Sequence, residues 1–281
     1  MKCKGTPLIK ERRSERLFKS LLCIDNNRYN RSEQVSCVLK LYDNAPKNKE
    51  KSIFRGMVIP TLGKLGLILD YGKMVKPSEN GRLLLLGKLL GNDISKFVEG
   101  QILADLDLET FHFLDIIQKE GPEKLKVMEK LLALTTGDCP DKQKLERVNN
   151  WLTLLDKGEL VKKSRESITL NLDFLNTLHQ QNEEALKKIK EFRHETLSTY
   201  SKLAKETQGI VDIEEIRIEV CGSFLKKYNR VVTKRIFDQM LSDLIREETK
   251  LIITLGHSMG KGEKLLKMDG EYYRTIYIRK G

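Results

Sequence analysis

The sequence predicts a mainly helical fold with small β-hairpins, and three observations support this. Most apolar residues recur at the three- and four-residue spacing of amphipathic helices. Helices of this kind lead three times into a short apolar run, a turn and a second short run, which is the pattern of a two-stranded hairpin. A chain of 281 residues that is 40% hydrophobic can also bury a core, and it is long enough for one large domain or two to three small ones.

The first helix-and-hairpin segment lies within residues 1–90. Apolar spacing predicts helices over Ser32–Leu41 and Glu50–Ile59, and Pro60 either kinks the second helix or opens a new one. A helix end that passes into a strand, a turn and a returning strand form a hairpin over Leu65–Lys76. Ser78 is then expected to cap the next helix.

Residues 91–207 are expected to form a helical linker subdomain that repeats the pattern more weakly. Its predicted helices are Thr110–Lys119, Glu123–Leu134 and Lys142–Leu155, followed by a hairpin over Lys162–Asn171. Asn182–Thr207 has almost no helix breakers and carries a thin apolar stripe. It therefore predicts one long spacer helix.

Residues 208–281 show the pattern most clearly. A helix is predicted over Ile216–Tyr228, and Thr233 is expected to cap a second helix. That second helix has one apolar face, and Arg235 and Gln239 lie on the opposite side. The strands expected after it are Leu251–Leu255 and Tyr272–Arg279, separated by the glycine-rich, basic segment Gly256–Lys267.

A helix, a turn, a second helix and a two-stranded wing together make the winged helix-turn-helix. In this fold the second helix of the helix-turn-helix enters the major groove of DNA. We therefore expect tandem winged helix-turn-helix subdomains. An N-terminal arm and the first subdomain would occupy residues 1–90, a helical and winged-helix-like linker 91–207, and the second DNA-binding subdomain 208–281.

The positive charge lies at the two ends of the chain. The chain has 51 Lys and Arg against 40 Asp and Glu, a net charge of +11. Residues 1–88 have 19 basic and 8 acidic residues, residues 89–212 have 18 and 22, and residues 213–281 have 14 and 10. Two basic modules that meet one polyanion explain this distribution. Chance clustering in a modestly basic protein is the alternative.

Composition argues against membrane, secreted and zinc-binding proteins. No apolar stretch approaches the roughly 18–20 residues of a membrane span, and the basic start has no signal-peptide core, so we expect a cytoplasmic protein. The cysteines are odd in number and scattered, and we expect them to be reduced: Cys3, Cys23, Cys37, Cys139 and Cys221. The four histidines are equally dispersed, so no metal site and no cofactor is expected in this chain.

Motifs for catalysis are missing from the sequence. There is no phosphate-binding loop, dinucleotide fingerprint, zinc-protease motif or serine-nucleophile elbow. The only acid-x-Lys followed by an apolar strand is Glu248-Thr249-Lys250, which we expect to be a surface pair at a helix end. Gly260-Lys261-Gly262 lacks the context of a phosphate loop and is interpreted as a wing tip. We therefore expect no catalytic residue here.

Duplex DNA is the favoured polyanion. Readers of RNA and single strands stack bases on exposed aromatic rings. Aromatic residues make up only 6% of this chain, and most lie at core spacing. Tyr272, Tyr273 and Tyr277 could stack on bases, but packing on the sheet face is the preferred interpretation.

The candidate DNA-contacting residues fall into three groups. The arm supplies Lys2, Lys4, Lys10, Arg12, Arg13 and Arg16, unless it is simply a frayed terminus. The first module supplies Arg28, Asn30, Arg31, Lys49, Lys51, Ser52 and Arg55. The last module supplies Lys227, Asn229, Arg230, Thr233, Lys234, Arg235, Asp238, Gln239 and Lys261. Arg235 suits guanine, Gln239 adenine and Asp238 the amino group of cytosine.

The tandem modules, the basic arm and the segment Met57–Ile68 with Pro77–Arg82 after its wing support a resemblance. Over its full length the chain resembles the DNA-recognition domains of type IIS-like restriction endonucleases of the BpuJI kind. The resemblance implies that two winged-helix subdomains and a linker subdomain bind one short asymmetric duplex site as a monomer. Cleavage, and the divalent metal it needs, would belong to a separate nuclease domain.

Two other functions remain open from the sequence. A winged-helix regulator of transcription or replication would need no nuclease and would dimerise, with the long Asn182–Thr207 helix as a natural interface. A scaffold whose winged helices bind proteins is the third interpretation, and the basic ends count against it.

Overall fold

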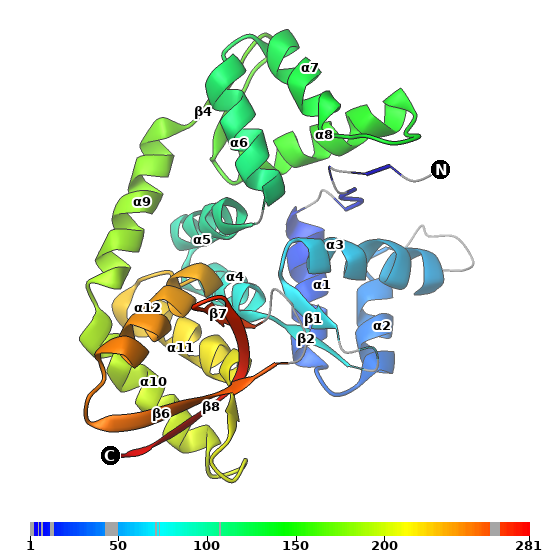
Figure 1. The fold of residues 1–281 in the computed structure, drawn as a ribbon. Helices are drawn as coiled ribbons and strands as arrows, with labels where there is room; N and C mark the ends of the chain where they lie inside the picture. The colour runs from blue at the N-terminus through cyan, green and yellow to red at the C-terminus, as the bar shows by residue number, and fades with distance from the viewer. Residues whose placement is uncertain are drawn as a thin grey trace. The chain divides into compact units, whose positions relative to one another are not determined.

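The computed structural model describes residues 3–4, 6, 8–11, 14–42, 50–70, 72, 74–106, 108–258 and 265–281. Within these residues it has 12 α-helices, a π-helical segment, two separate two-stranded hairpins and one small antiparallel sheet (Figure 1). The expectation of a mainly helical fold with small β elements is therefore confirmed.

The chain divides into two compact units, Met1–Leu178 and His179–Gly281, and each is described by itself. The boundary lies within helix α9 (Leu172–Leu186). The finer division into subdomains that end at residues 90 and 207 stays a prediction.

Unit 1 begins with helices α1 (Ser14–Asn26) and α2 (Arg31–Leu39), and α2 confirms the helix predicted over Ser32–Leu41. The π-helical segment η1 (Glu50–Val58) follows and runs directly into α3 (Ile59–Lys64). Pro60 lies in the first turn of α3, where the missing N–H removes no intrahelical hydrogen bond. Pro60 therefore opens a new α-helical segment.

A small hairpin and helix α4 complete this first segment. Strands β1 (Ile68–Asp70) and β2 (Val75–Pro77) pair antiparallel, with Tyr71 and Lys73 of the predicted turn outside the described residues. Ser78 caps α4 (Glu79–Leu90) as expected, because its Oγ accepts the Gly81 N–H at 3.1 Å.

The core of the first segment joins its helices to the hairpin. The buried Gln34 side chain on α2 donates to the carbonyls of Ile24 on α1 (3.3 Å) and Val75 on β2 (2.8 Å). Around it lie apolar side chains that are fully or almost fully buried: Leu21, Ile24, Val38, Phe54, Leu62 and Val75. The two hydrogen bonds that this buried amide nitrogen donates tie α2 to α1 and to β2.

The second segment has the same order of elements. After α5 (Asn92–Asp105) come three helices and a hairpin: α6 (Leu108–Glu120), α7 (Lys124–Ala133), α8 (Asp141–Lys157), β3 (Val161–Lys163) and β4 (Ile168–Leu170). All three predicted helices and the hairpin are confirmed. Trp151 on α8 packs on Phe113 on α6 with ring centroids 6.2 Å apart, so these helices share one core.

The prediction of one long spacer helix over Asn182–Thr207 is wrong. Helix α9 ends at Leu186, Lys187 and Lys188 form a turn, and α10 runs over Ile189–Leu203. After the break, Phe192 on α10 is fully buried against Phe224 and Phe237. Helix α10 is thus the first helix of the last segment.

The last segment, in unit 2, adds α11 (Ile213–Tyr228) and α12 (Lys234–Glu247), close to the predicted bounds. Its sheet has the order β5-β8-β6, with β5 at Val211–Asp212, β6 at Leu251–His257 and β8 at Glu271–Lys280. Short β7 (Leu266–Met268) pairs with β8. Figure 1 shows β6 and β8 side by side, and Leu251 lies opposite Lys280. Both predicted strands are confirmed and are slightly longer than expected.

Two disulfides correct the expectation that all cysteines are reduced. Cys3 pairs with Cys139, and Cys23 pairs with Cys37. Cys221 is a buried thiol. Spacing along the sequence could not show that Cys3 and Cys139, 136 residues apart, have Cα atoms only 4.7 Å apart.

The cytoplasmic location stays a prediction, and the cysteines no longer support it. No helix in the described part of the chain is long and apolar enough to span a membrane.

Candidate nucleic-acid interface

Helix α12 presents a polar surface opposite its buried face. Its apolar residues Ile236, Phe237, Met240, Leu241 and Leu244 are buried. Arg235 and Gln239 are exposed on the other side, as the helical spacing predicts. Thr233 has the extended backbone of an N-cap and is itself buried.

Asp238 and Lys234 of the predicted contact set are engaged within the protein. The side chain of Arg217 on α11 is 0% exposed, and its Nη2 donates to Asp238 Oδ1 at 3.0 Å. Lys234 forms an ion pair with the other oxygen of Asp238 and donates to the Leu265 carbonyl at 3.3 Å. The pairing links α11, α12 and the residue before β7.

Lys227 and Arg230 also form ion pairs. Lys227 Nζ lies 2.8 Å from Glu195 on α10, and Arg230 lies 2.7 Å from Glu184 on α9. Asn229 has the left-handed backbone that ends α11. These residues join the helices of unit 2, and whether they also touch DNA stays a prediction.

Glu195 is the most buried of these partners, with its side chain 6% exposed. Burial raises the pKa of the Glu195 carboxyl, but hydrogen bonds from Lys227 and Ser223 outweigh it and hold that pKa below its usual value. The hydrogen bond to Glu195 in turn raises the pKa of Lys227. Lys227 is therefore positively charged in its ion pair with Glu195.

The strands of unit 2 and the turn between β7 and β8 carry or contact further charges. Arg274 on β8 pairs with Asp212 at 3.2 Å, and Arg246 pairs with Asp269 at 2.7 Å. His257, at the end of β6, packs on Tyr273 with centroids 4.7 Å apart. Lys261 lies outside the described residues.

The first segment exposes a second polar helix surface. On η1, Lys51, Ser52 and Arg55 are exposed while Ile53 and Phe54 are buried. This alternation places all three predicted contact residues on one side. Lys49 lies outside the described residues.

The predicted contacts before α2 have local partners. Arg28 pairs with Asp25 at 2.6 Å, and Asn30 Oδ1 accepts the Glu33 N–H at 3.2 Å as the cap of α2. Arg31 lies 3.6 Å from Asp70. Asp70 ends β1, so of these three residues Arg31 is the one whose partner lies on the hairpin β1–β2.

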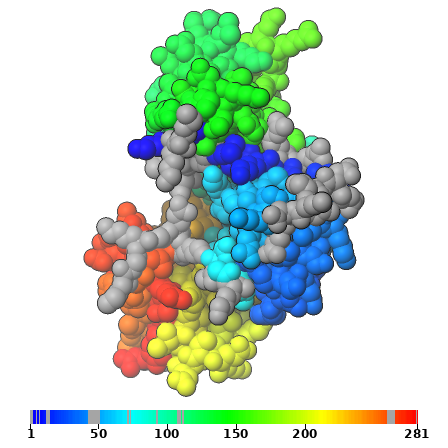
Figure 2. All heavy atoms as spheres, turned by 90° about the vertical axis from the view of Figure 1, so that its right-hand side faces the viewer, coloured from blue at the N-terminus to red at the C-terminus, as the bar shows by residue number. Residues whose placement is uncertain are grey.

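The described residues of the N-terminal arm lie on unit 1. The backbone of Lys4 forms a β-bridge with Thr136. Lys10 Nζ donates to the Gly56 carbonyl at 2.9 Å, and the Arg16 guanidinium lies over the Tyr42 ring. In Figure 2 the dark blue atoms near the N-terminus lie between the green α7–α8 region and the blue helices. Lys2, Arg12 and Arg13 lie outside the described residues, and groove binding by the arm stays a prediction.

No group of three or more His, Cys, Asp or Glu in the described ranges is placed to hold a metal ion. Glu248 of the acid-x-Lys motif pairs with Arg193 at 2.8 Å. The hydrogen bond from Arg193 lowers the pKa of the Glu248 carboxyl. The contacts of Glu248 are those of a helix-end ion pair.

Sequence reasoning missed Arg217, Glu195 and their partners. Arg217 lies among the buried, mostly apolar positions of α11. The only sequence signal of its role is therefore a basic residue at core spacing, with an acidic residue available on the next helix. Burial of the Arg217 guanidinium without an acidic partner would be costly. The sequence could therefore suggest that Arg217 has an acidic partner, but not that this partner is Asp238.

Three comparisons complete the description of the chain. No protein-family model matches it, and no curated protein or solved structure was found to match it in sequence or in fold.

Proposed function

We propose that this chain binds double-stranded DNA sequence-specifically through winged helix-turn-helix modules. The observation that carries the proposal is the order of elements in the last segment. Helices α10, α11 and α12 lead into a hairpin, and the sheet order is β5-β8-β6. Helix α12 then exposes Arg235 and Gln239, side chains suited to base edges, on its side away from the core.

The repeated arrangement in unit 1 supports the same function. The sets α1–α2–η1/α3 with β1–β2 and α6–α7–α8 with β3–β4 follow the same order of three helices and a hairpin. In the first set η1 exposes Lys51, Ser52 and Arg55. Basic side chains of this kind neutralise phosphates and give most of the salt-dependent affinity.

We also propose that the recognised site is short and asymmetric. The modules have different exposed side chains and lie on one chain, so a monomer can read a non-palindromic sequence. We further propose that the chain is the target-recognition part of a restriction endonuclease whose catalytic domain lies outside these residues. Only the resemblance to such enzymes supports this part of the proposal. The regulator alternative is weaker, because the continuous spacer helix that was to form its dimer interface is broken at Lys187 and Lys188.

The test is a selection of bound sequences from random duplexes at stated salt, followed by Arg235→Ala. Loss of a bidentate guanine contact should cost about 1–3 kcal/mol and relax one base position. Lys202→Ala on α10 removes one exposed positive charge as a control and should leave base preference unchanged. Selection of no sequence by the unaltered protein would end the proposal. Equal weakening of Arg235→Ala on every sequence would make Arg235 a phosphate contact.

A further inference from the structure

We propose that the Cys3–Cys139 disulfide is a thiol-exchange site. A low-molecular-weight thiol would open it and release the N-terminal strap, defined as the described residues Cys3, Lys4, Thr6 and Leu8–Lys10, from helix α8 and from η1. The position of the disulfide and the contacts that the strap makes support this exchange, whether or not the chain binds DNA.

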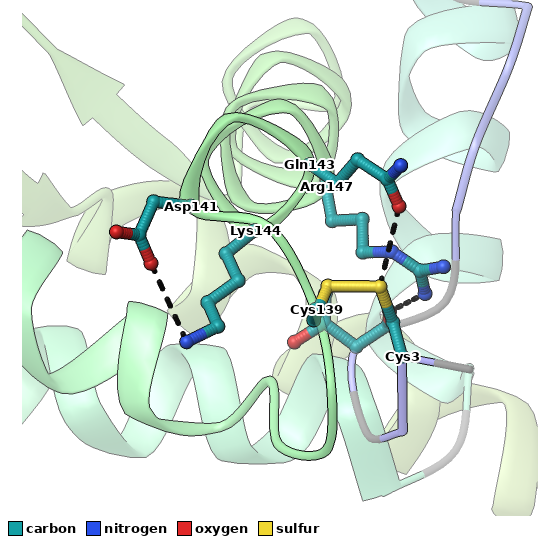
Figure 3. The surroundings of a disulfide bond; sticks show 7 residues. Cys3, Cys139, Asp141, Gln143, Lys144 and Arg147 are labelled. Carbon is teal, nitrogen blue, oxygen red and sulfur yellow. Dashed lines mark hydrogen bonds and ion pairs between the residues drawn. A yellow bond between two sulfur atoms is a disulfide. The ribbon is translucent and has the colours of Figure 1, made fainter. Parts of the chain in front are cut away.

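The disulfide fastens the start of the chain to the turn before α8. It joins residues 136 apart in sequence. Next to it, Lys4 and Thr136 exchange two backbone hydrogen bonds of 2.9 and 3.0 Å. Figure 3 shows the sulfur bridge beside the amino end of α8, with Gln143 and Arg147 on the same side. One covalent bond and one β-bridge thus secure the first described residues.

Beyond the disulfide, the strap is held through its backbone carbonyls. Arg147 donates to the Thr6 carbonyl and Asn150 to the Ile9 carbonyl, both at 2.6 Å. Both donors lie on α8, so the strap follows that helix.

The far end of the strap reaches η1 and α3. Lys10 Nζ donates to the Gly56 carbonyl on η1 at 2.9 Å, and Lys64 Nζ on α3 lies 3.4 Å from the Leu8 carbonyl. The strap therefore connects the disulfide to the helix that exposes Lys51, Ser52 and Arg55. Release of the strap would remove contacts from that helix.

The two sulfurs differ in a way that favours exchange. Cys3 is partly exposed, whereas Cys139 is only 8% exposed, so Cys3 is the more accessible residue for an incoming thiolate. Cys139 would then leave as a thiolate just before the amino end of α8. The positive end of a helix dipole stabilises a thiolate, and a more stable thiolate leaves faster.

The exchange balances with two small thiols. The first thiolate attacks Cys3 Sγ, the S–S bond breaks, and Cys139 takes up a proton. The second attacks the mixed disulfide, which releases the oxidised small-molecule disulfide and the Cys3 thiol. Two electrons and two protons thus pass to the protein. The Cys3 thiol then has an acceptor, because Gln143 Oε1 lies 3.4 Å from its Sγ.

The second disulfide provides a matched contrast. Cys23 and Cys37 are 14 residues apart and join α1 to α2. These helices are also held by Gln34, whose side chain donates to the Ile24 carbonyl. A disulfide that closes a short loop constrains the unfolded chain less than one that closes a long loop. Opening Cys23–Cys37 should leave both helices in place.

The experiment compares hydrogen exchange of the whole chain in oxidised glutathione and in dithiothreitol. Reduction should speed exchange of the Lys4 and Thr136 amides about tenfold or more, without a comparable change in α11 and α12. Cys3→Ser with Cys139→Ser should show the fast exchange in both buffers. Cys23→Ser with Cys37→Ser should respond to dithiothreitol as the unaltered protein does.

Three results would overturn the proposal. The first is alkylation of both Cys3 and Cys139 after equilibration with oxidised glutathione. The second is equal protection of Lys4 and Thr136 in the two buffers, and the third is a rise in exchange spread over the entire chain. The comparison of the unaltered protein in two buffers decides the matter even if a double variant fails to fold.

Discussion

At the residue scale, Arg217 and Asp238 determine how α12 is interpreted. A guanidinium that is 0% exposed needs an anion beside it, and Asp238 supplies one at 3.0 Å. An aspartate occupied in this way has less freedom to accept a hydrogen bond from the amino group of cytosine. The contacts therefore favour Asp238 as a positioning residue for α12, while Arg235 and Gln239 remain the candidate base readers.

Asp238→Asn separates these two roles. Asp238→Asn should lower the unfolding free energy of unit 2 by about 3 kcal/mol, because the buried Arg217 cation loses the charge of this counter-ion. Base preference should stay the same. Urea unfolding and duplex selection measure the two effects, with Gln239→Ala as an exposed control expected to change stability by at most about 0.5 kcal/mol. Unchanged stability with relaxed reading of one cytosine would contradict this assignment.

Glu195 makes unit 2 sensitive to acid. Hydrogen bonds hold its pKa below the ordinary value of 4.5, so the folded state binds its proton less readily than the unfolded state. The resulting stability is fully present above that value and is lost as the pH falls through the lowered pKa. Glu195→Gln should therefore cost about 1–3 kcal/mol at pH 7 and flatten the decline below pH 4.5.

Urea unfolding at several pH values checks this prediction. Glu206→Gln, an exposed change beyond the end of α10, serves as the control and should preserve the unaltered profile. An equally steep loss of stability in Glu195→Gln would mean that other carboxylates cause the acid sensitivity.

At the element scale, α4 packs closely on the backbone of Leu67, the residue before β1. A Cβ added to Gly81 in its first turn would lie 2.1 Å from the Leu67 carbonyl oxygen, which is backbone and cannot move aside cheaply. Gly63 on α3 has no atom within 4 Å of such a Cβ. The same substitution should therefore have opposite effects in two helices of one segment.

Gly81→Ala should destabilise unit 1 by about 1–3 kcal/mol or more, because the helix must shift away from Leu67. Gly63→Ala should stabilise it by about 0.5–1 kcal/mol through the better helix propensity of alanine. Thermal unfolding of both variants measures the pair. Equal effects in the two variants would show that α4 is not held against Leu67.

Much of the element order was predictable from sequence because it depends on local signals. Apolar periodicity identified α7, α8, α11 and α12, and the Ser78 cap followed from its place before a helix. The Lys187–Lys188 break was not predictable, because no glycine or proline marks it in the sequence. The disulfides and the strap depend on long-range proximity, which spacing does not encode.

The exposed face of the candidate site was predictable for the same reason. Arg235 and Gln239 follow from helical period alone, as do Lys51 and Arg55 on η1. The ion pairs Lys227–Glu195 and Arg217–Asp238 did not follow, because each of them joins two different helices. Local periodicity locates a surface, whereas pairing across helices decides which of its charges are already occupied.

At the scale of the whole molecule, the basic surplus of the two ends is the central physical feature. Residues 1–88 and 213–281 carry the excess of Lys and Arg, and the helices η1 and α12 expose side chains from both. If both ends neutralise phosphates of one duplex, the association constant must fall steeply as salt replaces released counterions.

The most direct measurement is a titration of the full chain with one selected duplex at several salt concentrations. Six or more phosphate contacts predict a fall in affinity of about a thousandfold between roughly 50 and 200 mM salt. A fall of less than about tenfold over that range, or no binding to any duplex at the lowest salt, would contradict the account.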